Sequence, residues 1–418
     1  APQITTYAVF NNLFLPTGVK HQRNSPRRHG LNCRYAKMLQ SFRVYLFIHS
    51  KPGCTPKNLG LAINCKKCIK IVVDRFAIHR FLAAAVAMAG RGRLMEASAT
   101  IIPIASGKGG VGKTFVTANL AMALAELGHR TVAVDLDLGG SNLNSFLGLQ
   151  NRFPGIGDYL NTPKGDLASL LVPTHLPQLK VLPGDGKTPF MANIPYARKV
   201  KLLSAIRKLP ADYILLDLGA GSSYNTLDYF GIAEKGMIVT SPSPPAILNM
   251  LVFLKNFLLR SIGKKFPQNT GVKTLIQRLA ARPMSEQMAS IEALRREIVT
   301  EDPTADKVIA EICNNCRPRV VFNFGEHPDQ LQVADQISKS LTSILSIEAD
   351  YFGFVFYDDA VRLSVFNPAT MLAQSREYPA VQSVYQIAKR IEKFWDQKVQ
   401  DSARRLTIQI RERYDAGG

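Results

Sequence analysis

The chain has 418 residues, 46% of them hydrophobic and 20% charged, which is the composition of a globular protein and excludes a collagen-like or largely disordered chain. Its 52 lysines and arginines outnumber its 32 acidic residues, for a formal net charge of +20. Most of this excess lies in residues 1–94, which hold 16 basic residues and one acidic residue, Asp74, whereas the other residues hold 36 and 31. No run of about 18 uncharged apolar residues occurs, so we expect no transmembrane helix.

Residues 1–94 form a basic N-terminal extension in which neither a helical nor a strand period is sustained. Its basic and aromatic residues would suit contacts with nucleic acid, and its acid-poor composition is shared by transit peptides. We favour a third interpretation, in which the segment is disordered or is not native sequence. Codons for residues 90–92, Gly-Arg-Gly, can spell a purine-rich ribosome-binding site, and Met95 follows closely. We therefore expect translation to begin at Met95; tryptic peptides from residues 1–90 of the endogenous protein would contradict this.

An apolar strand predicted at 101–105 leads into a glycine-rich segment and then into a helical pattern. Backbone N–H groups of a loop in this position point at an anion, and the helix dipole adds positive potential. The spacing from Gly107 to Gly112-Lys113-Thr114 fits the complete P-loop pattern. We expect Lys113 to reach the β- and γ-phosphates of a nucleotide and the Thr114 hydroxyl to ligate Mg²⁺. The predicted nucleotide contacts in the loop are Gly107, Lys108, Gly109, Gly110, Val111, Gly112, Lys113 and Thr114.

Lys108 places a second lysine inside this loop. The form Lys-Gly-Gly-x-Gly-Lys-Thr resembles the deviant Walker A motif of the MinD/ParA ATPases, and Lys108 matches their signature lysine. The resemblance implies that Lys108 reaches across the interface of an ATP-dependent homodimer to the nucleotide of the partner subunit. It also implies slow hydrolysis of ATP to ADP and phosphate, stimulated by an activating protein partner.

Carboxylates end two of the following predicted strands. Residues 131–137 place Asp135 and Asp137 on the same side of a strand, and the apolar run 213–218 carries Asp217. Both strand ends lie at the edge where open α/β sheets bind ligands. The resemblance implies that Asp137 positions the attacking water, that Asp135 lies close to the magnesium, and that Asp217 is the Walker B aspartate, which holds Mg²⁺ through water. The predicted catalytic residues are Lys108, Lys113 and Asp137, and the predicted metal site consists of Thr114, Asp135 and Asp217.

A later predicted strand, 319–323, ends in Asn323, which matches the asparagine that family members use against the adenine base. A plain turn residue is the alternative for Asn323. Residues 351–359 resemble the strand and loop whose backbone walls the adenine pocket, with Tyr357 where relatives often carry proline. The predicted cofactors are therefore ATP and Mg²⁺.

The resemblance covers about residues 100–393, and segments 144–154 and 182–186 are most similar to MinD-like proteins of the FlhG type. Segment 241–245 lacks an acidic residue that is common there in MinD-like proteins, so interface contacts of this segment are not carried over. Between residues 254 and 316 the chain is longer than the core family requires, and we expect an added helical hairpin. Its apolar stripe is interpreted as core, with a docking surface as the alternative; it consists of Met284, Met288, Ile291, Leu294 and Ile298.

Residues 396–418, after Trp395, have the pattern of an amphipathic C-terminal helix. We expect its thin apolar face to pack on the parent domain or on a partner, with an anionic membrane surface as the alternative. The apolar face consists of Val399, Ala403, Leu406 and Ile410, and the basic residues around it are Lys398, Arg404, Arg405 and Arg411.

Two Cys-x-x-Cys pairs, Cys65/Cys68 and Cys313/Cys316, raise the alternative of a zinc site or of an iron–sulfur ligand set like that of the Mrp-type carriers of this superfamily. Mrp-like carriers place their pair after the strand that ends in Asn323, whereas Cys313/Cys316 precede it. We interpret the cysteines as reduced thiols and predict no metal beyond magnesium.

The predicted architecture is one doubly wound α/β domain, residues 95–395, with a mostly parallel sheet of seven or eight strands and helices on both faces, as in P-loop NTPases of the SIMIBI type. The predicted function is an ATP-hydrolysing switch of the MinD/ParA/FlhG type that dimerises on ATP and organises a flagellum, a division site or DNA. We expect it in the cytoplasm, with the inner membrane surface as an alternative location; contacts with membrane or DNA are not favoured. The alternative functions are an Mrp-like cluster carrier and an ATP-dependent small-molecule synthase of the same fold.

Overall fold

The computed structural model describes residues 46–47, 62–64, 70–72, 99–150, 152–162, 165–184, 194–280, 291–359 and 378–417. The chain divides into two compact units, Ala1–Ala97 and Ser98–Gly418. Three short antiparallel strands are described in the first unit, in the order β1-β3-β2. They are β1 (Leu46–Phe47), β2 (Ala62–Asn64) and β3 (Lys70–Val72). The start at Met95 and the status of residues 1–94 stay predictions.

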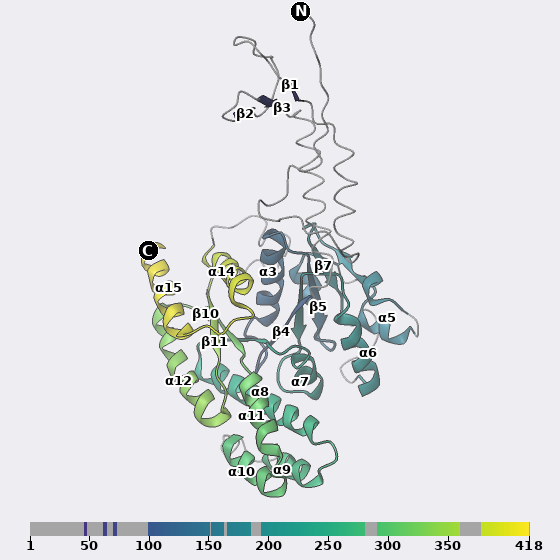
Figure 1. Ribbon diagram of the computed structural model, residues 1–418, viewed down its shortest axis with the longest axis vertical. Helices are drawn as coiled ribbons and strands as arrows, with labels where there is room; N and C mark the ends of the chain where they lie inside the picture. Colours follow the sequence, from purple (N-terminus) through teal and green to yellow (C-terminus); the bar gives the residue numbers. More distant parts are fainter. Residues whose placement is uncertain are drawn as a thin grey trace, which may run out of the picture. The chain divides into compact units, whose positions relative to one another are not determined.

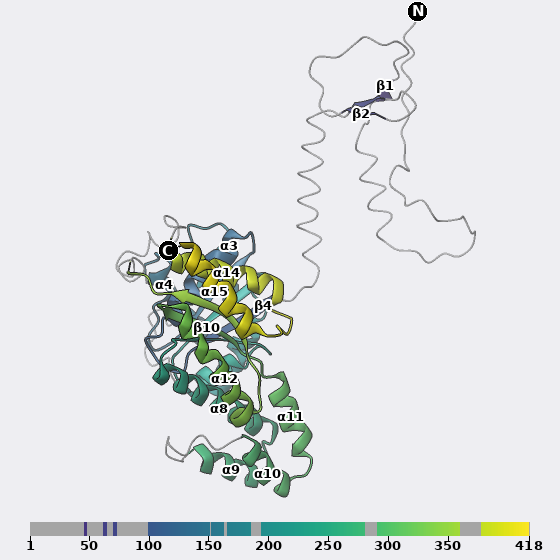
Figure 2. The same cartoon turned by 90° about the vertical axis from the view of Figure 1, so that its left-hand side faces the viewer.

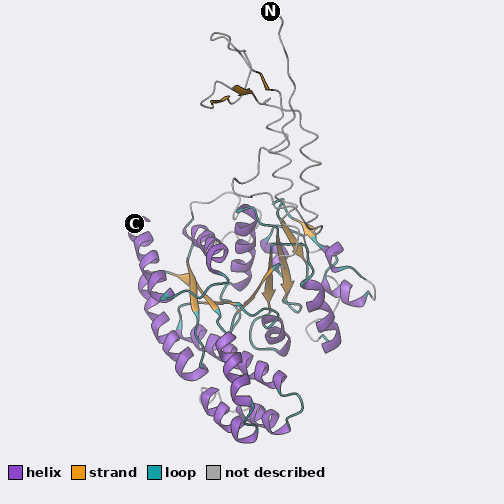
Figure 3. Ribbon diagram, viewed as in Figure 1, coloured by secondary structure: helices purple, strands orange, loops and turns teal. Residues whose placement is uncertain are grey.

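Eight strands form one sheet in the second unit, and helices cover both of its faces (Figures 1 and 3). The strand order is β11-β10-β9-β4-β8-β5-β7-β6, and every neighbouring pair except β6–β7 is parallel. The predicted doubly wound, mostly parallel sheet is therefore confirmed. The strands are β4 (Thr100–Ala105), β5 (Thr131–Leu136), β6 (Val172–Pro173), β7 (Leu179–Leu182), β8 (Tyr213–Leu218), β9 (Met237–Thr240), β10 (Arg319–Gly325) and β11 (Asp350–Phe356).

The central strands are buried on both faces, which is why their sequences are almost continuous apolar runs. Successive residues of β8 alternate between two cores, because Ile214 and Leu216 face one and Leu215 faces the other. The first core is closed by α6 (Tyr196–Ile206), α7 (Tyr224–Phe230) and α8 (Pro244–Lys265), and the second by α3 (Lys113–Glu126) and α14 (Pro379–Phe394). The remaining short helices of the sheet region are α4 (Leu143–Phe146), α5 (Ile156–Asn161), η1 (Leu167–Leu170), η2 (Pro328–Gln332), α12 (Val333–Ser340) and η3 (Leu341–Leu345).

The middle strand, β4, lies where the strand order reverses. The strands that follow it first in the chain, β5 to β8, lie on one side, and β9 to β11 lie on the other. Ligands of open α/β sheets bind at the carboxyl ends of the strands at such a reversal. The chain leaves β4 at this point through residues 106–112 and enters α3. The topology therefore places the glycine-rich loop at the expected ligand site.

Helix α8 is the one helix among the described residues that is long and apolar enough to cross a membrane by length and composition alone. Ten of its side chains are buried inside the second unit, including Met250, Phe253 and Leu254. Met250, Phe253 and Leu254 belong to the same core as strand residues such as Ile214 and Leu216. In this fold α8 is accordingly a core helix of the α/β unit.

The segment predicted as an added helical hairpin at 254–316 consists instead of the second half of α8 followed by three helices, so the prediction was wrong in both start and form. They are α9 (Thr270–Ala280), α10 (Ile291–Glu301) and α11 (Ala305–Asn315), at the lower end of the view in Figure 1. The start is later because the apolar face of α8 continues to Ile262, which is buried against the core. Met284 and Met288 lie outside the described residues. Ile291, Leu294 and Ile298 are buried, so this part of the stripe is core, as predicted.

The C-terminal helix α15 (Ser402–Gly417) packs on the parent domain, as predicted. Its residues Leu406 and Ile410 are buried in contact with the sheet region, and the helix lies along β11 (Figure 2). At its far end, Tyr414 stacks on Phe356 and Arg411 pairs with Asp329 at 2.7 Å. Protein therefore covers the apolar face that a membrane surface would otherwise contact.

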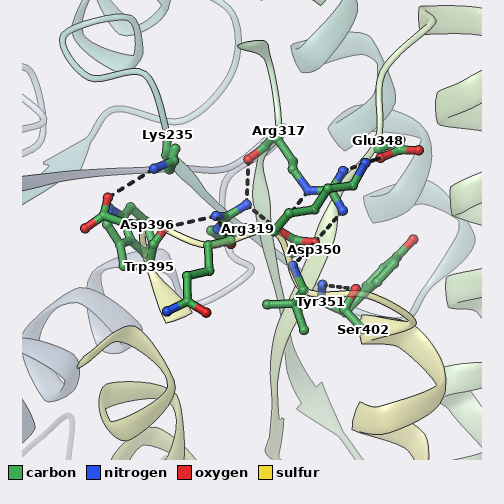
Figure 4. A network of polar contacts seen from close by, with 12 residues as sticks. Lys235, Arg317, Arg319, Glu348, Asp350, Tyr351, Trp395, Asp396 and Ser402 are labelled. Atoms are coloured by element: carbon green, nitrogen blue, oxygen red, sulfur yellow. Dashed lines mark hydrogen bonds and ion pairs between the residues drawn. The ribbon is translucent and has the colours of Figure 1, made fainter. Parts of the chain in front are cut away.

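A buried polar network at the amino ends of β10 and β11 fastens the C-terminal helices to the sheet (Figure 4). Arg319, 1% exposed, forms an ion pair with the fully buried Asp350. Arg317 Nη2 lies 2.7 Å from Asp350 Oδ1, so two guanidinium groups neutralise one carboxylate. Arg319 Nη2 also donates hydrogen bonds of 2.9 Å to the carbonyl oxygens of Trp395 and Gln397. Every charge in this network that is fully buried has a partner of opposite sign.

Candidate functional site

The loop between β4 and α3 is shaped by two glycines. Gly112 has φ 78°, and a Cβ atom there would lie 2.2 Å from Asn323 Nδ2. A Cβ atom at Gly107 would lie 2.2 Å from backbone atoms of Asn249 in α8, so the loop is in direct contact with that helix. The N–H groups of residues 108–112 donate to no protein group in the described part of the chain. They form, with the N-terminus of α3, the arrangement of donors that binds an anion.

Lys113 and Asp217 meet beneath this loop. Lys113 is 6% exposed, and its Nζ lies 2.6 Å from Asp217 Oδ1. The Thr117 hydroxyl donates to the same oxygen at 3.1 Å, from one turn further along α3. Asp217 is fully buried, and its other oxygen, Oδ2, has no hydrogen-bond partner. A buried carboxylate oxygen without a donor is costly unless a ligand binds it.

A second buried carboxylate lies beside the first, because Asp135 of β5 is the register partner of Asp217 of β8. Burial, and then the charge of Asp217, raises the pKa of Asp135 from its usual value to about 7. Lys113 is the one cation that pairs with either carboxylate among the described residues. The pair therefore has more negative charge than the protein neutralises, which fits a divalent cation. Thr114, half-buried in the first turn of α3, is the hydroxyl residue next to Lys113.

Asp135 and Asp217 differ in the groups that bind their carboxylate oxygens. Asp135 Oδ1 accepts from the backbone N–H of Asp137 at 3.1 Å, and its Oδ2 accepts from Ser141 Oγ at 2.6 Å and Leu143 N at 3.1 Å. These bonds fix the loop 137–143. Asp135 thus shapes the loop after β5, whereas Asp217 keeps an oxygen for a ligand.

Asp137 lies between the loops that follow β5 and β8. It is half-buried, and a Cβ atom at Gly219 would lie 3.4 Å from Asp137 Oδ1. Gly219 follows Asp217 by two residues, so Asp137 is adjacent to the loop of the Walker B position. The structure therefore brings Lys113, Asp135, Asp137 and Asp217 to one edge of the sheet, as the sequence predicts.

Asn323 lies at the same edge, but it holds the loop. It is 1% exposed, and its Nδ2 donates to the carbonyl oxygen of Val111 at 2.9 Å. The next residue, Phe324, has φ 61°, which is rare for a residue with a bulky side chain. Its ring is 38% exposed and forms an edge contact with Tyr357, with ring centroids 6.4 Å apart. Two partly exposed aromatic rings thus stand beside the loop where the sequence alone predicted Asn323 as the base contact.

Lys108 is half-buried in the loop and makes no ion pair or hydrogen bond with the residues that the structure describes. It differs in this from Lys113, whose charge is taken up by Asp217. The segment 241–245, also at this edge, has a contact of 2.9 Å between the hydroxyls of Ser241 and Ser243 and leads into α8 at Pro244.

The family model described as the CobQ/CobB/MinD/ParA nucleotide binding domain matches residues 102–371, which is more than half of the chain. The chain belongs to this family. The resemblance to MinD/ParA proteins is thus confirmed, and the matched range contains all of the loop and carboxylate residues described above.

Similar proteins in the family include the septum site-determining protein MinD of Thermotoga maritima, 35% identical over 161 residues, or 38% of this chain and 59% of that one. MinD of Synechocystis is 33% identical over 196 residues, covering 46% of this chain and 70% of the relative. The chain spans about half the length of other MinD relatives. A solved structure with a similar fold is Pyrococcus horikoshii MinD complexed with Mg-ADP, with 19% identity, a TM-score of 0.47, and coverage of 72% of this chain and 99% of that one.

Of the two cysteine pairs, the structure describes Cys313/Cys316, which lies at the end of α11 and not in the glycine-rich loop. Cys313 ends α11 and Cys316 follows it, and both are free and buried. Burial raises the pKa of Cys313 to about 11 and that of Cys316 to about 12, so both thiols are protonated at neutral pH. Cys65 and Cys68 lie outside the described residues. Within the described ranges, no group of three or more metal-ligating side chains of the His, Cys, Asp or Glu type occurs.

Sequence reasoning missed four residues of this MinD/ParA-type site: Thr117, Ser141, Asn249 and Phe324. Thr117 could have been found, because it lies one helical turn after Lys113 and therefore on the same face of α3. Ser141 and Asn249 act through contacts that close only in the fold. Phe324 depends on a left-handed backbone conformation that no local sequence signal predicts.

Proposed function

We propose that this chain is an ATP-dependent molecular switch, which binds and slowly hydrolyses ATP with Mg²⁺ and dimerises when ATP is bound. The observation that carries the proposal is the group formed by Lys113, Asp135 and Asp217 under the glycine loop. It combines an anion-binding loop, one buried lysine and more buried negative charge than the protein neutralises. Magnesium nucleotide supplies a ligand for each of these parts.

In this proposal, phosphate oxygens bind the N–H groups of residues 108–112, and Lys113 turns from Asp217 to the phosphates. The Asp217 carboxylate and the Thr114 hydroxyl would hold Mg²⁺, which would neutralise charge on the phosphates. Asp135 holds the loop 137–143 in position through its three hydrogen bonds. Asp137, at the start of that loop, orients the attacking water.

The proposed dimerisation rests on Lys108. Its ammonium group has no partner within the described residues, although it lies half-buried beside the phosphate cradle. A second subunit that inserts its own Lys108 against the same phosphates would contact ATP more than ADP. The nucleotide then shifts the monomer–dimer equilibrium by this difference in contact.

Light scattering of the full chain with magnesium-ATP tests the switch. Asp137→Ala should bind ATP, stop turnover and remain dimeric, and Lys108→Ala should bind ATP and remain monomeric. Lys180→Ala, an exposed lysine on β7, is the matched control and should behave as the parent chain. A monomeric Asp137→Ala protein at saturating ATP, or a dimeric Lys108→Ala protein, would refute the ATP-dependent dimer.

The cellular process is proposed from relatives. Several are named septum site-determining proteins, and one solved relative is a MinC:MinD cell division protein complex. We propose that this chain likewise works in the cytoplasm on the placement of a cellular structure, a division site or a flagellum, through an activating protein partner. Pull-down with Asp137→Ala in the presence of ATP tests this. Recovery of proteins of neither structure, with ATP hydrolysis intact, would separate the cellular role from the enzymatic one.

A further inference from the structure

A charged cluster lies where α6, α7 and α8 meet (Figure 1). Its centre is Asp228 of α7, whose side chain is 2% exposed. Lys199 forms an ion pair with it, and Arg260 Nε and Lys264 Nζ lie 2.9 and 2.6 Å from its Oδ1. Burial would raise the pKa of Asp228, but the hydrogen bonds from Arg260, Lys199 and Lys264 outweigh it and hold the pKa well below its usual value. Three cations around one carboxylate give the cluster a net charge of +2, and the other charged residues that line the adjacent pocket reduce the excess to +1.

Two solvent-exposed tyrosines, Tyr196 and Tyr224, contact the cations of this cluster. Tyr224 is 72% exposed and Tyr196 is 68% exposed, which makes them the most exposed of the large hydrophobic side chains described. The guanidinium carbon of Arg260 lies 4.7 Å from the ring centroid of Tyr224, and Lys199 Nζ lies 5.7 Å from that of Tyr196. The rings are therefore held by cations that a buried carboxylate anchors. Exposed, ordered Tyr and Arg side chains are the residue types that dominate protein–protein binding energies.

A pocket of about 280 Å³ opens beside the same cations. Its apolar lining comes from Leu227 of α7, Phe257 of α8, and Val308 and Ile312 of α11, and Arg260 and Lys264 also line it. Three helices, α7, α8 and α11, therefore form the walls of this pocket. The volume is at the lower limit of small-molecule sites, which hold about 300–1,000 Å³. It suits one inserted side chain better than a cofactor.

We propose that this tyrosine–arginine surface, made of Tyr196, Lys199, Tyr224, Arg260, Lys264 and the adjacent pocket, binds an acidic segment of a partner protein. Carboxylates of the segment pair with Arg260 and Lys264, and one of its apolar side chains fills the pocket. The positive charge of the surface favours an acidic segment, and the tyrosine rings favour one that also carries apolar side chains.

A nucleic-acid partner fits less well. Two glutamates, Glu234 and Glu311, line the same pocket and would repel a continuous phosphate backbone. A peptide can place a few carboxylates opposite Arg260 and Lys264 and have no acidic residue near the two glutamates. The pocket also accepts an aliphatic or aromatic side chain, which a phosphate backbone does not supply.

The test is selection of random twelve-residue peptides displayed on phage against the immobilised full chain. Selected peptides are then synthesised with fluorescein and titrated in solution. We expect enriched sequences that combine at least two acidic residues with Leu, Phe or Trp. Tyr224→Ala should weaken their binding about tenfold, the usual effect of truncating an interface anchor. Tyr224 is so exposed that its truncation should leave folding unchanged.

Arg260→Gln gives a second, charge-specific variant, since Lys199 and Lys264 still neutralise Asp228 in its absence. It should weaken the acidic peptides about tenfold as well. Arg405→Gln, an exposed arginine on α15, is the matched control and should change binding less than about twofold. Enrichment of no acidic peptides, or equal binding by the Tyr224→Ala and parent chains, overturns the proposal. Binding of a fluorescein-labelled 20-base-pair DNA duplex that Arg260→Gln removes would also overturn it, in favour of nucleic acid.

Discussion

Two edges of the same sheet bury carboxylates in opposite ways. At the amino edge, Asp350 is neutralised by Arg317 and Arg319 (Figure 4). At the carboxyl edge, Lys113 pairs with Asp217, and Asp135 beside it pairs with no cation among the described residues. One oxygen of Asp217 has no hydrogen-bond partner. A buried charge must be compensated, so a surplus within the protein indicates that a ligand completes the balance. The comparison separates a structural network from a binding site without reference to sequence motifs.

The largest expected effect on stability comes from removing a cation from the amino edge, where the charge of Asp350 is neutralised. Arg319→Ala leaves Asp350 with one cation and removes the bonds to the Trp395 and Gln397 carbonyl oxygens, so it should lower the free energy of unfolding by about 3–5 kcal/mol. Without nucleotide, Asp217→Asn should cost less than Arg319→Ala, because it also removes the repulsion between the Asp135 and Asp217 carboxylates. Urea denaturation measures both. Equal losses would mean that the two edges do not differ as described.

Magnesium nucleotide should stabilise the unbalanced edge. At a concentration of 100 times its dissociation constant, Mg-ADP should raise the free energy of unfolding by about 2.7 kcal/mol. The increase in Tm should disappear with EDTA and with Asp217→Asn, and it should persist in a milder variant of the amino edge, Arg317→Gln. A nucleotide-dependent increase in Asp217→Asn equal to that of the parent chain would show that Asp217 does not hold the metal.

The free energy of unfolding should depend on pH because of the excess negative charge of Asp135 and Asp217 at the carboxyl edge. The pKa of Asp135 is about 7 in the folded chain, above its value in an unfolded chain, about 3.9, so the folded chain binds more protons between these values. The contribution of Asp135 to the free energy of unfolding should therefore fall as the pH rises from about 5 to 7, by about 1 kcal/mol per unit, and level off above 7. Asp135→Asn should lose this slope. Urea titrations of both chains at several pH values, in EDTA, make the measurement.

The smallest expected effect concerns the aromatic rings next to the loop. Phe324→Ala should weaken nucleotide binding by about 1 kcal/mol, or roughly fivefold, because a base that stacks on the ring loses that contact. Free phosphate, which has no base, should bind equally to both chains. Calorimetric titration with ADP and with phosphate compares the two. Loss of phosphate binding would indicate that Phe324 supports the loop through Gly112 and does not contact the base.

The sequence predicted the phosphate loop well because its chemistry lies in one contiguous segment, where residue spacing determines which groups face the same side. The acidic strand ends were predictable for a related reason, since parallel strands bring their carboxyl ends to one edge. Their division of roles was not predictable. Asp135 is occupied by Ser141 and the backbone of the following loop, and Asp217 by Lys113 and Thr117, through contacts that close only in the folded chain.

The helical segment after residue 254 shows the opposite case. Periodicity identified helices after residue 254, but it could not tell where the core helix α8 ends, because the apolar face of α8 continues without interruption to Ile262. The network around Arg319 had no signal in the sequence at all. A charged residue at the start of a predicted strand is usually expected at the surface, and its burial depends on Asp350, 31 residues later.

The contact between Gly107 and the backbone of Asn249 has a mechanical consequence. Helix α8 has 22 residues and is therefore about 33 Å long. Asn249, in its second turn, contacts the phosphate loop at Gly107. Its last turn carries Lys264, which lines the pocket beside α11. The loop and the pocket therefore lie near the two ends of one continuous helix. A methyl group at position 107 would overlap the backbone of Asn249, so the loop and α8 can approach this closely only because position 107 has no side chain.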